Sequence, residues 1–210
     1  MKVKQLFYVL LAVSVFAVSG IANAKGIRQQ TSEKYDTATF ATGCFWCGEA
    51  KFSQLKGVIK VTAGYTGGHT EDPYYSLVCT GTTGHAEAFN VVYDSSVITY
   101  DELLQAFFLS HNPTELNRQG NDIGTQYRSA IFYHNDAQKQ RAAYYLQKFT
   151  QEKIYPKPIV TELTRFTVFY DAETHHQQYY KKHPTQDYCR YVIQPELEKF
   201  KQIFKDKLKQ

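Results

Sequence analysis

The sequence has little net charge, few cysteines and a single methionine. Its 210 residues carry 24 Lys and Arg against 20 Asp and Glu, and the formal charge of +4 is too small to indicate a nucleic-acid partner. Four cysteines are too few for a domain that is held together by disulfides. Aromatic residues, by contrast, include 17 Tyr and 14 Phe, which is typical of a globular chain with a sizeable core.

Long apolar runs are also missing, except near the N-terminus. Lys2 and Lys4 precede an apolar segment at 6–18, and Ala22-Asn23-Ala24 offers a small-residue cleavage site, so residues 1–24 are predicted to be a signal peptide. An uncleaved anchor is the alternative, but polar residues interrupt the run before the roughly 20 apolar residues of a spanning helix. We expect an exported protein, periplasmic or secreted, with a formal charge of +2 without the two lysines and no membrane partner after cleavage.

The remaining sequence predicts one domain at 37–210, preceded by a flexible segment at 25–36. Strands are predicted at 37–42, 58–65, 86–93, 127–133 and 166–169, and helices at 44–55, 74–79, 100–110, 137–152, 172–182 and 195–208. The Lys-rich end at 199–209 is interpreted as the solvated face of the last helix. Alternating helices and strands favour an α/β or α+β fold in which helices pack on a mixed sheet in two layers.

Cys44 lies in Gly43-Cys44-Phe45-Trp46-Cys47, where a predicted strand passes into a helix. Free backbone N–H groups and the helix dipole favour an anion at such a position. A thiolate is such an anion, so the position predicts a lowered pKa and a nucleophilic Cys44. Phe45 and Trp46 are predicted to wall an apolar pocket that suits a thioether methyl. The alternative is a core Phe-Trp pair beneath an inert thiol.

Two further segments carry polar groups that can do chemistry. Glu87 lies among small residues at the start of a predicted strand, and a desolvated carboxyl there keeps its proton and can act as a general acid. A surface glutamate is the ordinary alternative. The polar loop at 120–129 enters another strand, and such loops often only turn the chain.

Taken together, these motifs resemble the type A peptide methionine sulfoxide reductases. The resemblance covers nearly all of the chain after residue 36. Its motifs, in chain order, are Gly43 to Cys47, Gly64-Tyr65-Thr66-Gly67-Gly68, Tyr75 to Cys79, Gly84 to Ala88, Gln119 to Tyr133, His176 to Tyr179 and Tyr188-Cys189. One short match is weak, but all of them in this order are specific.

The resemblance implies a function, a fold and a set of site residues. It implies thiol-dependent reduction of the S epimer of methionine sulfoxide, free or in proteins, by a monomer with a ferredoxin-like core. Cys44 is the implied nucleophile, Phe45 and Trp46 receive the substrate methyl, and Glu87 protonates the sulfoxide oxygen. The implied residues that hold this oxygen are Tyr75 and Tyr127, supported by Asp122. No cofactor is implied beyond an external dithiol, such as a thioredoxin-like protein.

The second thiol of the reaction has two candidates. Cys189 matches the C-terminal resolving cysteine of the family, whereas Cys47 stands where many relatives have glycine. A mobile stretch at 184–187 favours Cys189, and bridging to Cys47 needs suitable S–S geometry one helical turn away. Cys79 is expected to be a small buried hydrophobe.

Other interpretations of the cysteines and histidines stay open. His175, His176 and His183 lack the spacing of zinc ligands, so no metal site is predicted. A thioredoxin-type oxidoreductase also places Cys-x-x-Cys at a helix start, although the bulky Phe45 and Trp46 and the Glu87 cluster argue against it. A non-catalytic exported domain with two structural disulfides is the third hypothesis.

Overall fold

The computed structural model describes residues 34–210. The predicted signal peptide and most of the predicted flexible segment lie outside the described residues. Strand β1 begins at Tyr35, two residues before the predicted start of the domain. No helix within residues 34–210 is long and apolar enough to cross a membrane.

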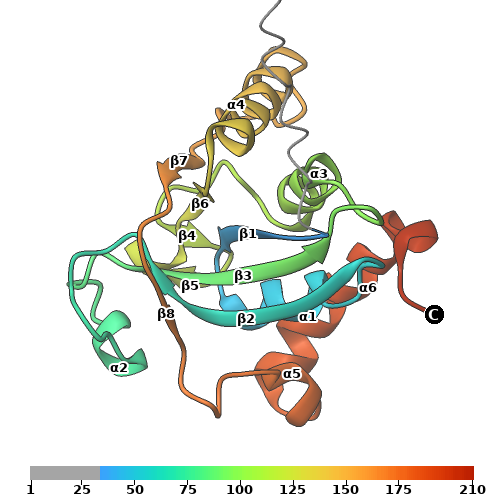
Figure 1. The fold of residues 1–210 in the computed structure, drawn as a ribbon. Helices are drawn as coiled ribbons and strands as arrows, with labels where there is room; N and C mark the ends of the chain where they lie inside the picture. Colours follow the sequence, from blue (N-terminus) through green and yellow to red (C-terminus); the bar gives the residue numbers. More distant parts are fainter. Residues whose placement is uncertain (1–33) are drawn as a thin grey trace, which may run out of the picture. The chain divides into compact units, whose positions relative to one another are not determined.

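The structure is a mixed sheet with helices packed on it (Figure 1). The strands are β1 (Tyr35–Thr42), β2 (Val58–Thr66), β3 (Ala86–Asp94), β4 (Arg118–Gln119), β5 (Asp122–Ile123), β6 (Ser129–Tyr133), β7 (Glu162–Arg165) and β8 (Phe169–Asp171). The α-helices are α1 (Phe45–Phe52), α2 (Tyr75–Val78), α3 (Tyr100–Ser110), α4 (Asp136–Gln151), α5 (Tyr179–Lys182) and α6 (Gln194–Ile203). A π-helical turn, Cys189–Ile193, leads directly into α6. The remaining helical turns are 3₁₀ turns at Thr125–Tyr127 and Lys205–Lys207.

The six strands of the main sheet have the order β7-β6-β1-β3-β2-β8. All neighbours are antiparallel except β6 and β7, which are parallel. The central four strands, β6-β1-β3-β2, with α1 after β1 and α3 after β3, form a βαββαβ core of the ferredoxin-like kind. The predicted fold class is therefore confirmed.

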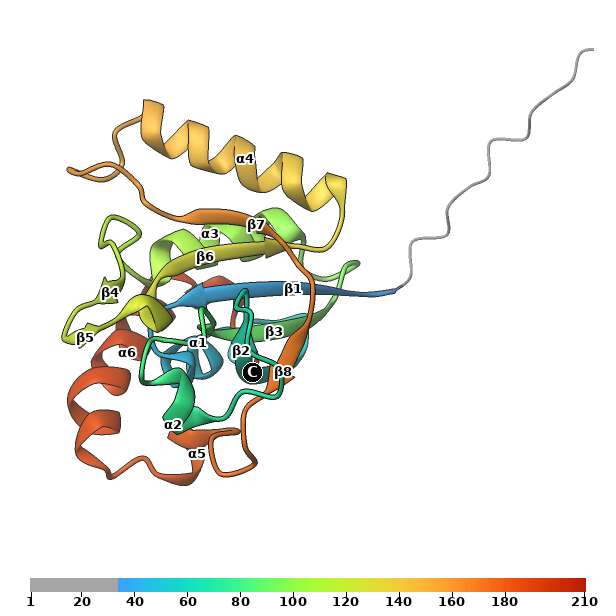
Figure 2. The ribbon, with the colours of Figure 1, turned by 90° about the vertical axis from the view of Figure 1, so that its left-hand side faces the viewer.

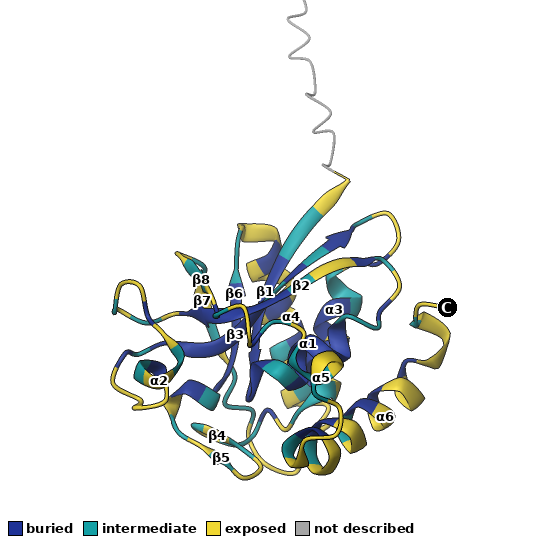
Figure 3. Ribbon diagram, turned by 90° about the horizontal axis from the view of Figure 1, so that it is seen from below, coloured by how far each residue is buried: buried dark blue, intermediate teal, exposed yellow. Residues whose placement is uncertain are grey.

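One large hydrophobic cluster joins the sheet to its helices. Phe40 of β1 and Phe89 of β3 contact Phe52 of α1 in this cluster, and α3, α4 and α6 contribute further apolar side chains. Helix α3 starts with a capping box, in which Thr99 and Glu102 bond each other's backbone N–H. Figure 3 shows the consequence of this packing, because the strands are mostly buried while α6 exposes one side.

The second half of the chain departs from several predicted elements. The strand predicted at 166–169 is wrong, because β7 ends before Phe166 and β8 starts at Phe169. The rings of these two residues pack against a separate buried cluster that consists mostly of alanines. Figure 2 shows the connection between these edge strands crossing the sheet. The segment before β6 is a 3₁₀ turn at Thr125–Tyr127, so the strand predicted from 127 starts only at Ser129. The predicted polar loop at 120–129 contains the turn and the second strand of the β4–β5 hairpin.

The segment after β8 is mostly turns, where a helix at 172–182 was predicted. The Gln177 amide donates to the carbonyls of Ala63 and Ala172, both at 2.8 Å, and Gln178 has a left-handed backbone with φ of 54°. These bonds to β2 replace helical ones, so only Tyr179–Lys182 is helical. We call residues 172–203 the C-terminal arm. Its last helix ends at Ile203, short of the predicted end at 208.

Candidate active site

Cys44 lies where β1 turns into α1. It is the N-cap residue of α1, so the helix begins at Phe45, one residue after the predicted start, and it ends at Phe52, before the predicted end at 55. Gly43 makes this turn possible, since its φ is +92° and a Cβ there would lie 2.5 Å from the Gln119 Cβ. The close approach of Gln119 brings the β4–β5 hairpin against the reactive cysteine.

The Cys44 thiol is covered, and this reverses the predicted effect on its pKa. Only 7% of Cys44 is exposed, and burial raises its pKa well above the ordinary value. The Cys47 thiol adds to this rise, whereas the Tyr188 hydroxyl and the Cys47 backbone N–H lower the pKa. Burial prevails, because a helix terminus contributes only about 0.3–1 kcal/mol and desolvation acts on the whole charge. While Cys44 is buried in this way, which we call the covered state, its thiol keeps its proton.

Glu87 lies on β3 with its carboxyl group directed at the start of α1. It is 1% exposed, and its Oε2 accepts a hydrogen bond of 3.1 Å from the Phe45 backbone N–H. Burial, followed by the nearby Cys44, raises the pKa of this carboxyl well above its ordinary value. Glu87 is therefore a buried carboxylic acid next to the thiol, and the surface alternative is excluded.

Tyr75 and Tyr127 bring two hydroxyl groups toward this carboxyl. Burial and then the charge of Glu87 raise the pKa of both phenols, so both stay neutral donors. Sequence reasoning missed Glu173, which fixes Tyr75 from the C-terminal arm. Its carboxylate accepts from the Tyr75 backbone N–H and from the Tyr65 hydroxyl, both at 2.9 Å.

Phe45 and Trp46 form part of an aromatic group beside the thiol. Trp46 stacks on Tyr179 of α5, with ring centroids 3.7 Å apart and an interplanar angle of 6°. His176 packs 4.4 Å from the Tyr75 ring and 5.5 Å from the Phe45 and Trp46 rings. Sequence reasoning assigned a role to Phe45 and Trp46 but placed His176 and Tyr179, which complete the aromatic group, only in a motif.

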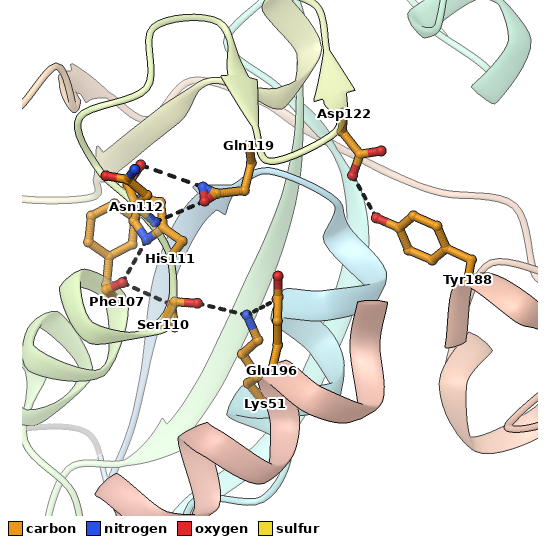
Figure 4. A network of polar contacts seen from close by, with 9 residues as sticks. All are labelled: Lys51, Phe107, Ser110, His111, Asn112, Gln119, Asp122, Tyr188 and Glu196. Atoms are coloured by element: carbon orange, nitrogen blue, oxygen red, sulfur yellow. Dashed lines mark hydrogen bonds and ion pairs between the residues drawn. The ribbon is translucent and has the colours of Figure 1, made fainter. Parts of the chain in front are cut away.

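Asp122 meets the C-terminal arm in this structure. Its Oδ2 accepts a hydrogen bond of 2.6 Å from the Tyr188 hydroxyl (Figure 4). The Tyr188 ring also stands edge-on to Trp46, with centroids 5.9 Å apart. Tyr188 of the C-terminal arm therefore contacts Asp122, Trp46 and Cys44. The sequence placed Tyr188 in a motif but gave it no role.

The four cysteines are all free, and all lie in the described residues. Cys47 and Cys189 are buried in the same cluster as Cys44, so both candidate resolving thiols lie close to the nucleophile. Cys79 is exposed, which corrects the expectation of a buried hydrophobe, because α2 lies on a surface loop and Cys79 ends it. The hypothesis of two structural disulfides has no support here.

No group of three or more His, Cys, Asp or Glu side chains in residues 34–210 is placed to hold a metal ion. His176 packs among aromatic rings, and His183 packs on Tyr179 with centroids 4.7 Å apart. A cavity of about 730 Å³ between α1, β2 and the C-terminal arm is lined by none of the predicted catalytic side chains. The arrangement at Cys44 is instead a covered site, with a thiol, a carboxylic acid and two phenols converging.

Comparisons with known proteins agree with this chemistry. The family model described as peptide methionine sulfoxide reductase matches residues 36–208. The chain is 51% identical over 172 residues to peptide methionine sulfoxide reductase MsrA of Natronomonas pharaonis, covering 82% of this chain and 97% of that one. It is 52% identical over 174 residues to the MsrA of Saccharolobus solfataricus, covering 83% and 97%.

Solved structures show the same fold. The reduced form of Mxr1 from Saccharomyces cerevisiae aligns with a TM-score of 0.68 at 35% identity, covering 75% of this chain and 90% of that one. Methionine sulfoxide reductase A of Corynebacterium diphtheriae aligns with a TM-score of 0.66 at 35% identity, covering 77% and 80%.

Proposed function

Because the chain belongs to the type A peptide methionine sulfoxide reductase family, we propose that it reduces methionine S-sulfoxide to methionine through Cys44. The observation that carries this proposal is the Glu87 carboxylic acid, which is buried beside the Cys44 thiol. A sulfoxide oxygen leaves poorly, so it needs a proton while sulfur attacks. The site pairs a nucleophile and an acid for that purpose.

In the first step, the Cys44 sulfur attacks the sulfoxide sulfur while Glu87 donates its proton to the oxygen. Tyr75 and Tyr127, whose phenols stay neutral near Glu87, stabilise the charge that develops on this oxygen. The oxygen passes to Cys44, and the proton that Cys44 loses restores Glu87. The substrate sulfur is reduced by two electrons, and Cys44 is oxidised to a sulfenic acid.

Substrate entry requires the C-terminal arm to give way. Tyr188 contacts Asp122 and the Cys44 thiol in the covered state, so a substrate that reaches Cys44 displaces its hydroxyl group. Asp122 then supports the bound sulfoxide in place of Tyr188. Phe45 and Trp46 receive the methyl group, and this arrangement of methyl pocket and oxygen donors selects one epimer.

The sulfenic acid is then resolved by a second thiol, for which we propose Cys189. Cys189 is fully buried in the Cys44 cluster and directly follows Tyr188, which touches the nucleophile. Cys47 also contacts the Cys44 thiol and is the alternative first partner. The disulfide is recycled by an external dithiol such as a thioredoxin-like protein.

Residues 1–24 are proposed to direct export, which places this reductase in the periplasm or the medium. The support is the order of charged, apolar and small residues in that segment. A signal-peptidase product that begins near Lys25, identified by N-terminal sequencing, is the expected outcome. Full-length protein retained in the cytoplasmic fraction contradicts it.

We also propose that the exported enzyme is a monomer.

The reaction is tested by incubating the enzyme with each sulfoxide epimer and dithiothreitol. The wild type is expected to reduce the S epimer and leave the R epimer, while Cys44→Ser abolishes turnover. Cys79→Ser is the matched control, because it removes a thiol but keeps Cys44, Glu87 and both candidate resolving thiols, and turnover is expected to persist. Equal reduction of both epimers, or turnover in Cys44→Ser, rejects the proposal.

A further inference from the structure

Lys51 is a buried cation for which the proposed reaction has no use. It lies on α1 and is 1% exposed. A buried ammonium group costs several kcal/mol unless partners replace its water. Its Nζ has two partners, the Ser110 carbonyl at 2.7 Å and the Glu196 Oε2 at 2.6 Å (Figure 4). The charge therefore ties α1 to the end of α3 and to the start of α6.

The end of α3 is a fixed point for this contact. The His111 ring bonds the Phe107 carbonyl at 2.8 Å and the Ser129 hydroxyl of β6 at 2.7 Å. Burial lowers the pKa of His111 to about 3, so its ring is neutral beside Lys51. Ser110 is thus held against the sheet, and Lys51 links the C-terminal arm to this rigid region.

The spacing along the two elements relates the ion pair to the thiols. Lys51 follows Cys44 by seven residues, and Glu196 follows Cys189 by seven residues. Residues that are four apart share one face of a helix, so Cys47 and Lys51 lie on the same side of α1, which begins directly after Cys44. The π-helical turn of Cys189 passes into α6 without a loop. The position of Glu196 therefore sets the position of Cys189.

We propose that Lys51 is a positioning residue for the resolving step, acting through its ion pair with Glu196. The pair holds α6 so that the Cys189 sulfur can attack the Cys44 sulfenic acid. An S–S bond forms, the Cys44 sulfur is reduced and the Cys189 sulfur is oxidised, and the oxygen leaves as water with the two protons. This inference rests on the proposed function.

The two partners differ in exposure, and this makes the contact releasable. The Glu196 side chain is 41% exposed while that of Lys51 is 1% exposed. When the arm moves to admit substrate, Glu196 gains water, and Lys51 keeps the Ser110 carbonyl. Re-forming the pair returns Cys189 to Cys44. The π-helical turn that joins Cys189 to the helix of Glu196 is a kind of irregularity that is common at functional sites.

The test separates methionine formation from disulfide formation in single turnovers of the reduced full-length enzyme. Methionine is quantified after rapid quenching, and the Cys44–Cys189 disulfide is quantified by mass spectrometry of the same samples. Lys51→Met is expected to form methionine at the wild-type rate but the disulfide about tenfold more slowly or worse, because loss of near-attack geometry is costly. Dimedone should trap more Cys44 sulfenic acid in this variant.

Three further variants keep the test decisive. Glu196→Gln changes only the half-exposed partner, so it probes the pair even if Lys51→Met folds poorly, and the same slowing is expected. Lys51→Arg restores a cation and should recover most of the rate. Asp101→Asn is the matched control, because it breaks the ion pair with Arg141 between α3 and α4 and should leave both steps unchanged.

The outcomes also distinguish the two proposals. Normal disulfide formation in Lys51→Met and Glu196→Gln, or equal slowing in Asp101→Asn, overturns the positioning role. The positioning role is also overturned if methionine formation and disulfide formation fall together in Lys51→Met and Glu196→Gln and Lys51→Arg recovers neither rate. Absence of methionine formation in the wild type rejects instead the proposed function.

Discussion

The active site has a floor and a cover that are built differently. The floor comprises β1, the start of α1 and β3, where Cys44 follows a paired strand and Glu87 lies within one. The cover is the C-terminal arm, which is made of turns, short helices and a π-helical turn. It meets the floor through the buried cluster that Cys44 shares with Cys189 and Ile193, and through the contacts of Tyr179, Tyr188 and Glu196. Turns and short helices of this kind open at lower free energy than paired core strands do.

This difference assigns separate duties to the two regions. The floor fixes the nucleophile and the acid, which must be in place before the substrate arrives. The cover must open to admit the substrate and must then return Cys189 to Cys44. Changes in the floor should therefore affect methionine formation, and changes in the cover should affect recycling.

The largest effect is expected from Glu87→Gln in the floor. Loss of a general acid typically slows chemistry by about 10²–10⁴-fold, and the amide keeps an oxygen that can accept the 3.1 Å bond from the Phe45 N–H. We expect a folded enzyme whose single-turnover methionine formation falls by this factor. The measurement is rapid-quench kinetics with unfolding followed in parallel, and a wild-type rate in Glu87→Gln refutes the assigned role.

The next largest effect is expected from Cys189→Ser in the cover. The first turnover should keep its rate, because Cys44 and Glu87 are untouched, while recycling by a thioredoxin-like donor should fall by about tenfold or more, since the proximate resolving thiol is lost. Cys47→Ser should be the milder lesion. A disulfide found only between Cys44 and Cys47, with full recycling in Cys189→Ser, reverses this order.

A smaller effect is expected when the cover is loosened at Tyr188. Burial raises the pKa of Cys44 and is the largest cause, while the Tyr188 hydroxyl lowers it. Tyr188→Ala removes the hydroxyl group and part of the burial. Because burial is the larger cause, the pKa should fall, and the thiolate fraction at neutral pH should rise about tenfold for each unit. Iodoacetamide alkylation of Cys44 followed against pH should show a midpoint shifted to lower pH. Tyr191→Ala, at a 70% exposed side chain, is the control, and an unchanged midpoint in Tyr188→Ala contradicts the argument.

The sequence predicted the floor well because its signals are local. Alternating apolar residues predicted β1, β2 and β3, and the periodic pattern at 100–110 predicted α3 with its bounds. A strand that ends at a glycine before a helix placed Cys44. The environment of Glu87 followed from the small residues around it in β3, whose alanines are fully buried.

The cover could not be predicted in the same way, because its contacts join distant residues. Gln177 bonds the backbone of Ala63 and prevents the helix that the local pattern favours. Tyr188 covers Cys44 from 144 positions further along the chain, so the helix-start argument gave the wrong direction for the thiol pKa. The local pattern around Lys51 predicts only a polar residue within a helix. The ion pair that it forms when buried comes from Glu196, 145 residues away.

The smallest kinetic effect is expected from a change that weakens α3, a helix packed against the floor strands, without touching the site. Thr99 caps α3, where its Oγ1 accepts from the Glu102 N–H at 3.2 Å and its own N–H donates to the Glu102 carboxylate at 2.8 Å. Thr99→Ala removes the hydroxyl and should lower the free energy of unfolding by about 1 kcal/mol, the usual cost of a lost N-cap. Denaturant unfolding measures this loss. Methionine formation and disulfide formation should both keep their wild-type rates, because the cap lies at the opposite end of α3 from Ser110, which contacts Lys51. If Thr99→Ala instead slows disulfide formation as much as Lys51→Met does, then any loss of stability loosens the arm, and the separation of floor and cover fails.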